Sequence, residues 1–210
     1  RVALIDIENC MLCGACEQKC PSSAIDFSQK EEIIQVKVKA VIVATGFNLF
    51  DPTLIPRYGF GKYKNVITSM QMERELAPTR PFNNILRPSD GKTPDKIAYI
   101  FCTGSRDNTC GNAICSQVCC MYSTKQAQLL MGALPMADIT MYYINIRAFG
   151  KGFNEFYMQA KDMGAKYVKG KVASVSETEN GNLILRYEDI ATGKVTESEH
   201  DLVVLSVGLL

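Results

Sequence analysis

Nine cysteines are the residues of this chain whose type and spacing could do chemistry, and they form two groups. Thiolates are ligands of iron and zinc, and clustered cysteines in a reducing compartment bind metal more often than they form disulfides. The sequence therefore indicates two metal or redox sites. The first group is the run Cys10-x2-Cys13-x2-Cys16-x3-Cys20-Pro21, and the second comprises Cys102, Cys110, Cys115, Cys119 and Cys120.

The first group has the spacing of a bacterial-ferredoxin run for a [4Fe-4S] cluster. Such a run gives three ligands to one cube and the fourth to a second cluster, or all four ligands to a single cube. Gly14 lets the loop wrap closely, and Pro21 turns the chain away after the last ligand. A zinc knot or free thiols are the alternatives, although zinc sites usually show two separated cysteine pairs. We predict that the ligands are Cys10, Cys13, Cys16 and Cys20.

The second group lies at a predicted strand-to-helix turn. The apolar run at 97–101 indicates a buried strand, and a helix is expected at 116–131. In a nucleotide-binding unit this turn carries a G-x-G-x-x-G motif for a pyrophosphate, but here only Gly104 and Gly111 occur. A group that binds sulfur is therefore expected in the place of the phosphate.

The second group can be interpreted in three ways at this stage. Cys115 and Cys119 are four residues apart, so on one helix they share a face, and a helix N-terminus favours an anion such as a thiolate-bound iron–sulfur cube. A redox dithiol and a structural zinc site remain alternatives. We expect Cys110, in a polar loop, to be a bystander. The four thiolates that could hold one [4Fe-4S] cluster are those of Cys102, Cys115, Cys119 and Cys120.

Composition narrows the class of protein. The chain has 210 residues, 47% of them hydrophobic, and a net charge of +1, which gives no reason to expect a nucleic-acid or membrane-surface partner. No apolar run approaches the roughly 18 residues of a spanning helix, and no signal peptide is evident, so we expect a soluble, cytoplasmic protein. The only histidine, His200, follows an acidic stretch and is expected to be solvated. Because the sequence begins at Arg1 and ends within a strand-like run, we expect a fragment of a longer protein.

The N-terminal half is expected to contain strands and a connector. Strands are predicted at 2–7, 33–38 and 40–44. The last of these ends in Ala44-Thr45-Gly46, a turn typical of flavoproteins with two dinucleotide-binding domains, in which it approaches the flavin; an ordinary core strand is the alternative. Residues 48–95 contain most of the prolines and one predicted helix at 68–76, so we interpret them as a connector.

The C-terminal half alternates strands and helices. After the strand at 97–101 and the helix at 116–131, we predict a strand at 139–146, a helix at 153–163 and a strand at 167–169. An antiparallel meander follows at 171–177, 183–188 and 195–199, with a last parallel strand at 202–207. This is the layout of a Rossmann-like pyridine-nucleotide lobe. It lacks the glycine triad and has Asn145 and Arg147 where an acidic residue would bind NAD, so we predict a retained fold without the dinucleotide.

These motifs together resemble the A subunit of heterodisulfide reductases. The resemblance is carried by Cys102-x-Gly-Ser-Arg-Asp107, Cys115-Ser-x-Val-Cys119-Cys120, Asn145-Ile-Arg-Ala-Phe-Gly-Lys-Gly152 and Asp201-Leu-Val-Val-Leu-Ser-Val-Gly208. The ferredoxin run and the Ala-Thr-Gly turn are also similar to this family. The resemblance covers nearly the whole chain.

The resemblance implies an α/β fold: a fragment of a thioredoxin-reductase-like two-dinucleotide-binding-domain flavoprotein with a ferredoxin-like [4Fe-4S] insertion. It implies a ferredoxin-like segment at 1–32, part of the FAD lobe and connector at 33–95, and the Rossmann-like lobe with its meander at 96–210. It also strengthens the assignment of both cysteine sets as ligands of [4Fe-4S] clusters. The N-terminal glycine motif for FAD is absent, so we expect FAD to be bound by the full-length protein.

The activity implied by the resemblance is electron transfer. An oxidoreductase subunit of this kind passes electrons between a donor, FAD, ferredoxin and a heterodisulfide by flavin-based bifurcation, as in methanogenesis, and the fragment alone is not expected to be catalytically competent. The implied partners are the B and C subunits, an electron-delivering subunit of a hydrogenase or formate dehydrogenase, and ferredoxin. Alternatives are a related quinone-interacting oxidoreductase subunit of sulfate reducers and a zinc-binding structural module. Arg106 and Asp107 are placed to tune the second cluster, with a surface ion pair as the alternative.

Overall fold

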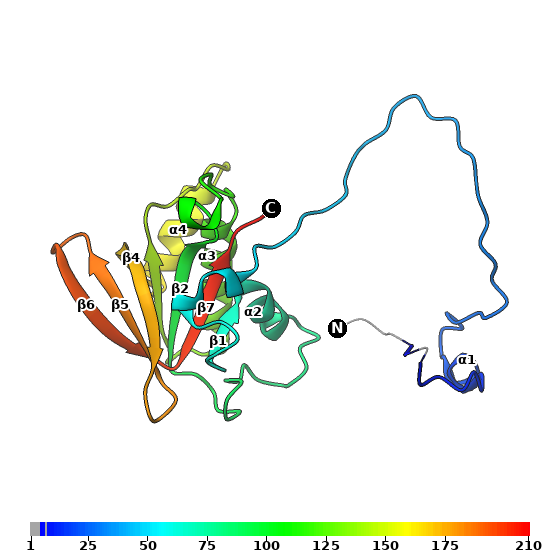
Figure 1. Cartoon of the computed structure of the whole chain (residues 1–210), viewed down its shortest axis with the longest axis horizontal. Coiled ribbons are helices and arrows are strands. Elements are labelled where there is room, and N and C mark those ends of the chain that lie inside the picture. The colour runs from blue at the N-terminus through cyan, green and yellow to red at the C-terminus, as the bar shows by residue number, and fades with distance from the viewer. Residues whose placement is uncertain (1–4, 7) are drawn as a thin grey trace. The chain divides into compact units, whose positions relative to one another are not determined.

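The computed structural model describes residues 5, 6 and 8–210 and divides the chain into two compact units, Arg1–Thr45 and Gly46–Leu210 (Figure 1). Among the described residues of the first unit there is one short helix, α1 (Ala15–Lys19). Gly14 precedes α1 in the left-handed conformation, with a φ of 69°, and this positive φ makes glycine the suitable residue there. The strand predicted at 2–7 falls mainly on residues outside the described ones.

The strands predicted at 33–38 and 40–44 are wrong, because both segments are irregular in the structure. Their apolar side chains are exposed; Ile33 is 85% exposed and Ile42 is 92% exposed. A strand is stabilised by hydrogen bonds to a neighbouring strand. Within the described residues of this unit no strand lies beside these segments. Their strong β propensity alone, without a partner strand, does not produce a strand.

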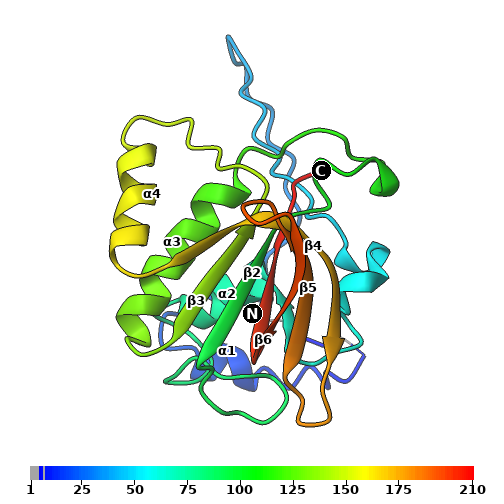
Figure 2. The same cartoon turned by 90° about the vertical axis from the view of Figure 1, so that its left-hand side faces the viewer.

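The second unit is built on a seven-stranded sheet with the order β1-β7-β2-β3-β4-β5-β6. The pairs β1–β7, β7–β2, β2–β3 and β3–β4 are parallel, whereas β4–β5 and β5–β6 are antiparallel, as predicted for a parallel sheet that continues into a meander. Figure 2 shows the twisted sheet with α3 and α4 along one side. The strands are β1 (Val66–Thr68), β2 (Lys96–Thr103), β3 (Asp138–Tyr143), β4 (Lys166–Glu177), β5 (Leu183–Asp189), β6 (Lys194–His200) and β7 (Leu202–Val207).

Three helices accompany the sheet, and their predicted positions are largely confirmed. Thr68 caps α2 (Ser69–Leu76) with a capping box in which the Thr68 hydroxyl accepts from the Gln71 N–H and the Gln71 side chain accepts from the Thr68 N–H. The other helices are α3 (Cys119–Ala133) and α4 (Phe153–Asp162), and short 3-10 turns occur at Pro52–Leu54, Pro56–Tyr58 and Asn108–Cys110.

Helix α3 begins three residues later than the sequence predicts. Gln117 has a φ of 60°, and this left-handed residue interrupts a helix that would start at Ser116. The Ser116 hydroxyl is bonded to the Ser105 hydroxyl at 2.6 Å and accepts from the Leu209 N–H at 3.0 Å. These contacts hold Ser116 to the end of the sheet, so the segment before α3 is a loop.

The core lies on both faces of the sheet. On one face, Ile97, Tyr99 and Phe101 of β2 pack with Leu130 of α3 and Met72 of α2. On the other face, alternate residues of β2 and β7 pack against the meander and the segment around the first 3-10 turns; they include Ala98, Ile100, Val203, Leu205, Val172, Leu183, Leu185, Phe50 and Tyr58. The period of two along β2 thus sends successive side chains to different layers.

The strands predicted at 167–169 and 171–177 are one continuous strand, β4. Its first part pairs with β3, and from Gly170 onward it pairs with β5. A Cβ at Gly170 would lie 2.1 Å from the backbone oxygen of Glu188, so only glycine allows the two strands to approach where the partner changes.

The segment predicted as a connector is part of the second unit. It supplies β1, which pairs with β7, and Leu49 forms an antiparallel bridge with Leu209. None of the helices among the described residues has both the length and the apolar composition needed to span a membrane.

Candidate functional site

The first cysteine group occupies a tight loop and the short helix α1. Leu12 and Gly14 both have positive φ angles, 52° and 69°, so the loop turns sharply between successive cysteines. The sulfur of Cys20 accepts a hydrogen bond from the Ala24 N–H at 3.3 Å and lies 3.5 Å from the Ser22 hydroxyl. The Ser22 hydroxyl is the main cause of a lowered pKa at Cys20, and the Ala24 N–H adds to it. Backbone N–H groups that point at sulfur are a feature of iron–sulfur ligation.

Three parts of the second unit supply the second cysteine group. Cys102 lies at the end of β2, at an irregularity in the pairing with β7, and has a φ of 58°. Cys115 lies in the loop before α3, so the prediction that Cys115 and Cys119 share one helix face is wrong. Cys119 and Cys120 open α3 and are almost fully buried. A left-handed non-glycine residue such as Cys102 is costly and is retained where the surrounding structure fixes it.

Four of these thiols are close enough to influence one another. Burial, with smaller contributions from the neighbouring thiols of Cys102, Cys120 and Cys115, raises the pKa of Cys119 to about 12. Burial likewise raises the pKa of Cys102 to about 11, with contributions from Cys120 and Cys115. The structure therefore places Cys102, Cys115, Cys119 and Cys120 in one neighbourhood at the end of the sheet.

Cys110 is separate from these four thiols. It ends a 3-10 turn and packs with the core on the meander face, against the cluster that contains Phe50 and Tyr58. Cys102 and Cys120 pack with the core on the opposite face. Cys110 therefore packs on one face of the sheet, and Cys102 and Cys120 pack in the core on the other face.

Polar groups surround the four thiols. The Gln117 N–H donates to the Cys115 sulfur at 3.3 Å, and the Cys120 thiol donates to the Asn145 carbonyl at 3.8 Å. The guanidinium of Arg106 donates to the Asn145 side-chain oxygen. Asn145 lies in the loop that follows β3. This loop therefore contacts the cysteines at the end of the neighbouring strand β2.

The alternative that Arg106 and Asp107 form a surface ion pair is wrong. Asp107 is bonded to Arg57 at 2.9 Å and to Lys171 at 3.4 Å. The Thr109 hydroxyl is the largest cause of a strongly lowered pKa at Asp107, with Lys171 a further cause. Arg106 instead faces the cysteines and Asn145.

The donor set fits an iron–sulfur cluster in its chemistry. Cubane clusters are held by four cysteine thiolates. The first group has four thiols and the second has four besides Cys110, and backbone N–H groups are directed at Cys20 and Cys115. A single metal ion would need its ligands closer together than they are here. Across residues 5, 6 and 8–210, no three His, Cys, Asp or Glu side chains converge closely enough to hold one metal ion. The thiols are therefore grouped without forming a compact single-ion site.

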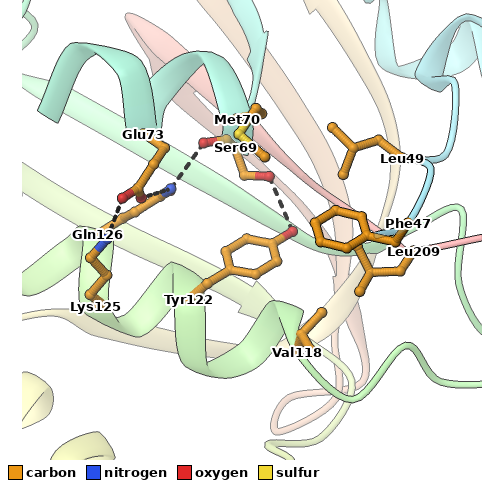
Figure 3. Close-up of a pocket in the computed structure, with 10 residues that line it drawn as sticks. All are labelled: Phe47, Leu49, Ser69, Met70, Glu73, Val118, Tyr122, Lys125, Gln126 and Leu209. Atoms are coloured by element: carbon orange, nitrogen blue, oxygen red, sulfur yellow. Dashed lines mark hydrogen bonds and ion pairs between the residues drawn. The ribbon is translucent and has the colours of Figure 1, made fainter. Parts of the chain in front are cut away.

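An apolar pocket of about 350 Å³ adjoins the first turn of α3 (Figure 3). The hydroxyl of Tyr122 accepts from Ser69 at 3.1 Å and donates to the Val207 carbonyl at 2.8 Å. At the other end of the pocket Lys125 forms an ion pair with Glu73. Sequence reasoning missed this pocket because its walls come from distant segments. They are Phe47, Leu49, Ser69, Met70, Glu73, Val118, Tyr122, Lys125, Gln126 and Leu209.

Two other predicted features lie elsewhere. Ala44, Thr45 and Gly46 are irregular and exposed, and Gly46 has a φ of 80°. The prediction that His200 is solvated is wrong: it is 6% exposed, and its Nε2 lies 3.1 Å from the hydroxyls of Tyr142 and Ser198. Burial lowers the pKa of His200 to about 4.

Comparisons with known proteins match both units. Residues 3–26 match the family model of the 4Fe-4S binding domain, so the first group lies in a ferredoxin-type segment. Over 209 residues the chain is 46% identical to the A subunit of the ferredoxin:CoB-CoM heterodisulfide reductase of Methanosarcina mazei, covering 99% of this chain and 26% of that protein. The chain is a homologue of a segment of the heterodisulfide reductase A subunit. The family resemblance predicted from the motifs is confirmed.

Other relatives have similar names. The A subunit of the H(2):CoB-CoM heterodisulfide,ferredoxin reductase of Methanothermobacter marburgensis is 44% identical over 210 residues, which is 99% of this chain and 32% of that protein. The A subunit of the H(2)/formate:CoB-CoM heterodisulfide,ferredoxin reductase of Methanococcus maripaludis is 45% identical over 191 residues, which is 90% of this chain and 29% of that protein. The chain thus spans between about a quarter and a third of the length of these relatives.

The matches among solved structures are more distant. An ornithine hydroxylase of Pseudomonas aeruginosa has a TM-score of 0.49 at 11% identity and covers 79% of this chain and 44% of that one. A thioredoxin reductase of T. acidophilum has a TM-score of 0.43 at 13% identity and covers 79% of this chain and 43% of that one. The α/β class, the ferredoxin-type segment and the meander predicted from the sequence are each confirmed.

Proposed function

We propose that this chain is part of an iron–sulfur flavoprotein subunit that transfers electrons, with a [4Fe-4S] cluster at each cysteine group. The observation that carries this proposal is the grouping of four thiols at the end of β2, in a chain 46% identical to a heterodisulfide reductase A subunit. Such a cluster accepts and releases single electrons. The fold contributes the ligands, their burial and the hydrogen bonds to sulfur.

The proposed ligands of the second site are Cys102, Cys115, Cys119 and Cys120. Each thiol must lose its proton when it binds iron. At Cys120 the thiol donates its proton to the Asn145 carbonyl, and that proton would be lost when the sulfur binds iron. The left-handed residues at positions 102 and 117 direct the strand end and the loop toward the first turn of α3. The proposed ligands of the first site are Cys10, Cys13, Cys16 and Cys20.

We propose that the full-length protein binds FAD and that the turn Ala44-Thr45-Gly46 contacts it. The apolar pocket is a further candidate for contact with the flavin, since its volume and apolar walls suit a flat ring system. Val118, which immediately precedes α3, and Tyr122, in its first turn, line this pocket on either side of Cys119 in the sequence. A ring bound there is therefore expected beside the second cysteine group, with the Lys125–Glu73 pair as its polar edge.

The names of the relatives suggest the reaction of the whole protein. They describe reductases of the CoB-CoM heterodisulfide that use ferredoxin, hydrogen or formate. We propose that the protein containing this chain passes electrons among such a donor, FAD, ferredoxin and a heterodisulfide by flavin-based bifurcation. Its proposed partners are the B and C subunits and an electron-delivering subunit of a hydrogenase or formate dehydrogenase, and the cytoplasm is its proposed location.

Metal and sulfide analysis of anaerobically purified protein tests the proposal, together with EPR after reduction by dithionite. Two cubes would give roughly eight irons and an equal amount of acid-labile sulfide per chain. Paramagnetic signals from two reduced clusters are the expected spectrum. Zinc in place of iron, in a colourless protein, would reject electron transfer and favour a structural module.

A further inference from the structure

Arg106 occupies an unusual position beside the second cysteine group. Its φ is 56°, so the backbone is left-handed there, and its N–H donates to the Ile114 carbonyl at 3.0 Å. The guanidinium donates to the side-chain oxygen of Asn145. The backbone carbonyl of the same Asn145 accepts from the Cys120 thiol at 3.8 Å. Asn145 therefore joins Arg106 and Cys120 in one contact network.

The charge of Arg106 acts on two of the proposed ligands. The guanidinium is close enough to the sulfur atoms of Cys102 and Cys120 to act on both of them electrostatically. The cation thus faces the thiols from the side of the Asn145 loop.

No carboxylate neutralises Arg106 among the residues that the structure describes. The ion pairs in this part of the chain involve other residues, and the adjacent carboxylate of Asp107 pairs with Arg57 and Lys171. Arg106 is only partly exposed, so solvent screens its charge incompletely. Its positive charge is therefore available to the sulfur atoms.

We infer that Arg106 is a positioning residue that raises the reduction potential of the iron–sulfur cluster at the second cysteine group. This inference rests on the proposed function, because it needs a cluster at that site. Reduction adds one electron from the donor to an anionic group, and no bond forms or breaks. A fixed cation stabilises the more negative, reduced state more than the oxidised state, and the low dielectric of a buried site strengthens this difference.

The test compares three substitutions in the full-length protein, purified anaerobically. Arg106→Gln removes the charge and keeps a donor for Asn145, whereas Arg106→Lys keeps the charge. Arg186→Gln is the matched control, since it removes the same charge from an exposed position on β5. The measurements are iron and sulfide content and an EPR-monitored redox titration, with the signal of the second cluster assigned through its loss in Cys119→Ser.

We expect Arg106→Gln to retain its iron and to lower the reduced-to-oxidised ratio of the second cluster about tenfold at a given potential, which for a one-electron couple is about 59 mV. Arg106→Lys should lie close to the unsubstituted protein, and Arg186→Gln should not differ from it. An unchanged midpoint potential in Arg106→Gln at full iron content would overturn the inference and leave the proposed function intact. If Arg106→Gln loses the cluster, Arg106→Lys decides the question. A midpoint potential in Arg106→Lys equal to that of the unsubstituted protein supports the inference, and a large fall in that midpoint potential overturns it. Absence of a second cluster in the unsubstituted protein would reject the proposed function itself.

Discussion

The two cysteine groups differ in how the chain brings their thiols together. The first group lies within residues 10–20, in a loop and one turn of helix, and Cys13 and Cys16 are exposed. The second group comes from a strand end, a loop and the start of α3, and Cys119 is 1% exposed. Local spacing is sufficient to define the first site, whereas the second exists only where the α/β unit is folded.

This difference has an energetic consequence. At the first site two of the proposed ligands are exposed to water, and the Ser22 hydroxyl lowers the pKa of Cys20. At the second site burial raises the pKa of Cys102 and Cys119, and iron must displace protons that the folded protein holds strongly. The second cluster is therefore expected to depend on the integrity of the fold, and the first is not.

Loss of one ligand of the buried site should give the largest effect. In Cys119→Ser we expect about half of the iron and sulfide to disappear, because serine is a poor ligand for a cube held by four thiolates. Iron analysis and EPR of the reduced protein measure this, and the spectrum of the first cluster should be unchanged. Full iron content in this variant would mean that the two sites do not differ as described.

Weakening the core beneath α3 should affect the second site alone. Leu130 is 0% exposed, and Leu130→Ala is expected to lower the free energy of unfolding of the second unit by about 3 kcal/mol through the cavity that it leaves. Leu129 is 44% exposed on the same helix, so Leu129→Ala is the matched control, with an expected change below about 0.5 kcal/mol. Urea unfolding followed by circular dichroism gives these values. The second cluster should be released at a lower urea concentration in Leu130→Ala, and simultaneous release of both clusters would contradict the account.

Acid should weaken the second unit before the first, because the only histidine is buried there. The pKa of His200 is lowered to about 4 in the folded state, below the unfolded value of about 6.5. Its contribution to stability is present above pH 6.5 and is lost as the pH falls through 4. The expected loss by pH 4 is about 3 kcal/mol. Between pH 7 and pH 4.5, the free energy of unfolding measured with urea should therefore fall more steeply in the unsubstituted protein than in His200→Gln. An equal dependence of this free energy on pH in the two proteins would refute the role of His200.

The smallest effect is expected at Cys110. It is half-buried on the meander face and lies apart from the four coupled thiols, so Cys110→Ser should keep all its iron and lose less than about 1 kcal/mol of stability. Iron analysis and urea unfolding test this together. If the iron content of Cys110→Ser fell by about half, Cys110 would be a ligand and the proposed ligand set of the second site would be wrong.

Much of the second unit could be predicted from the sequence because its patterns are local. The apolar runs of β2 and β7 and the Asn-Gly and Thr-Gly turns of the meander each indicate their element, and the structure has them. The capping residue Thr68 marks the start of α2 in the same way. Where side-chain period and turn residues agree, the sequence is sufficient.

The failures arise where distant contacts decide the conformation. Ser116 is held by Ser105 and Leu209, so α3 starts late and Cys115 leaves the helix, which spacing cannot reveal. His200 follows acidic residues but is buried beside Tyr142 and Ser198 on the inner side of the meander. The apolar residues at 33–43 have high β propensity, yet propensity does not supply a partner strand. The pocket beside α3 joins segments from both ends of the second unit and has no motif.

The central claim is that the buried cysteine group forms an iron–sulfur site of its own. The measurement that tests it most directly is iron, sulfide and zinc analysis, with EPR after dithionite reduction, on Cys13→Ser protein prepared anaerobically. Because the ferredoxin run is then disabled, any remaining cube must be held by the second group. The account predicts that about half of the iron and sulfide remains and that reduction gives the signal of a single cluster. Loss of all iron, or zinc in its place, would contradict it.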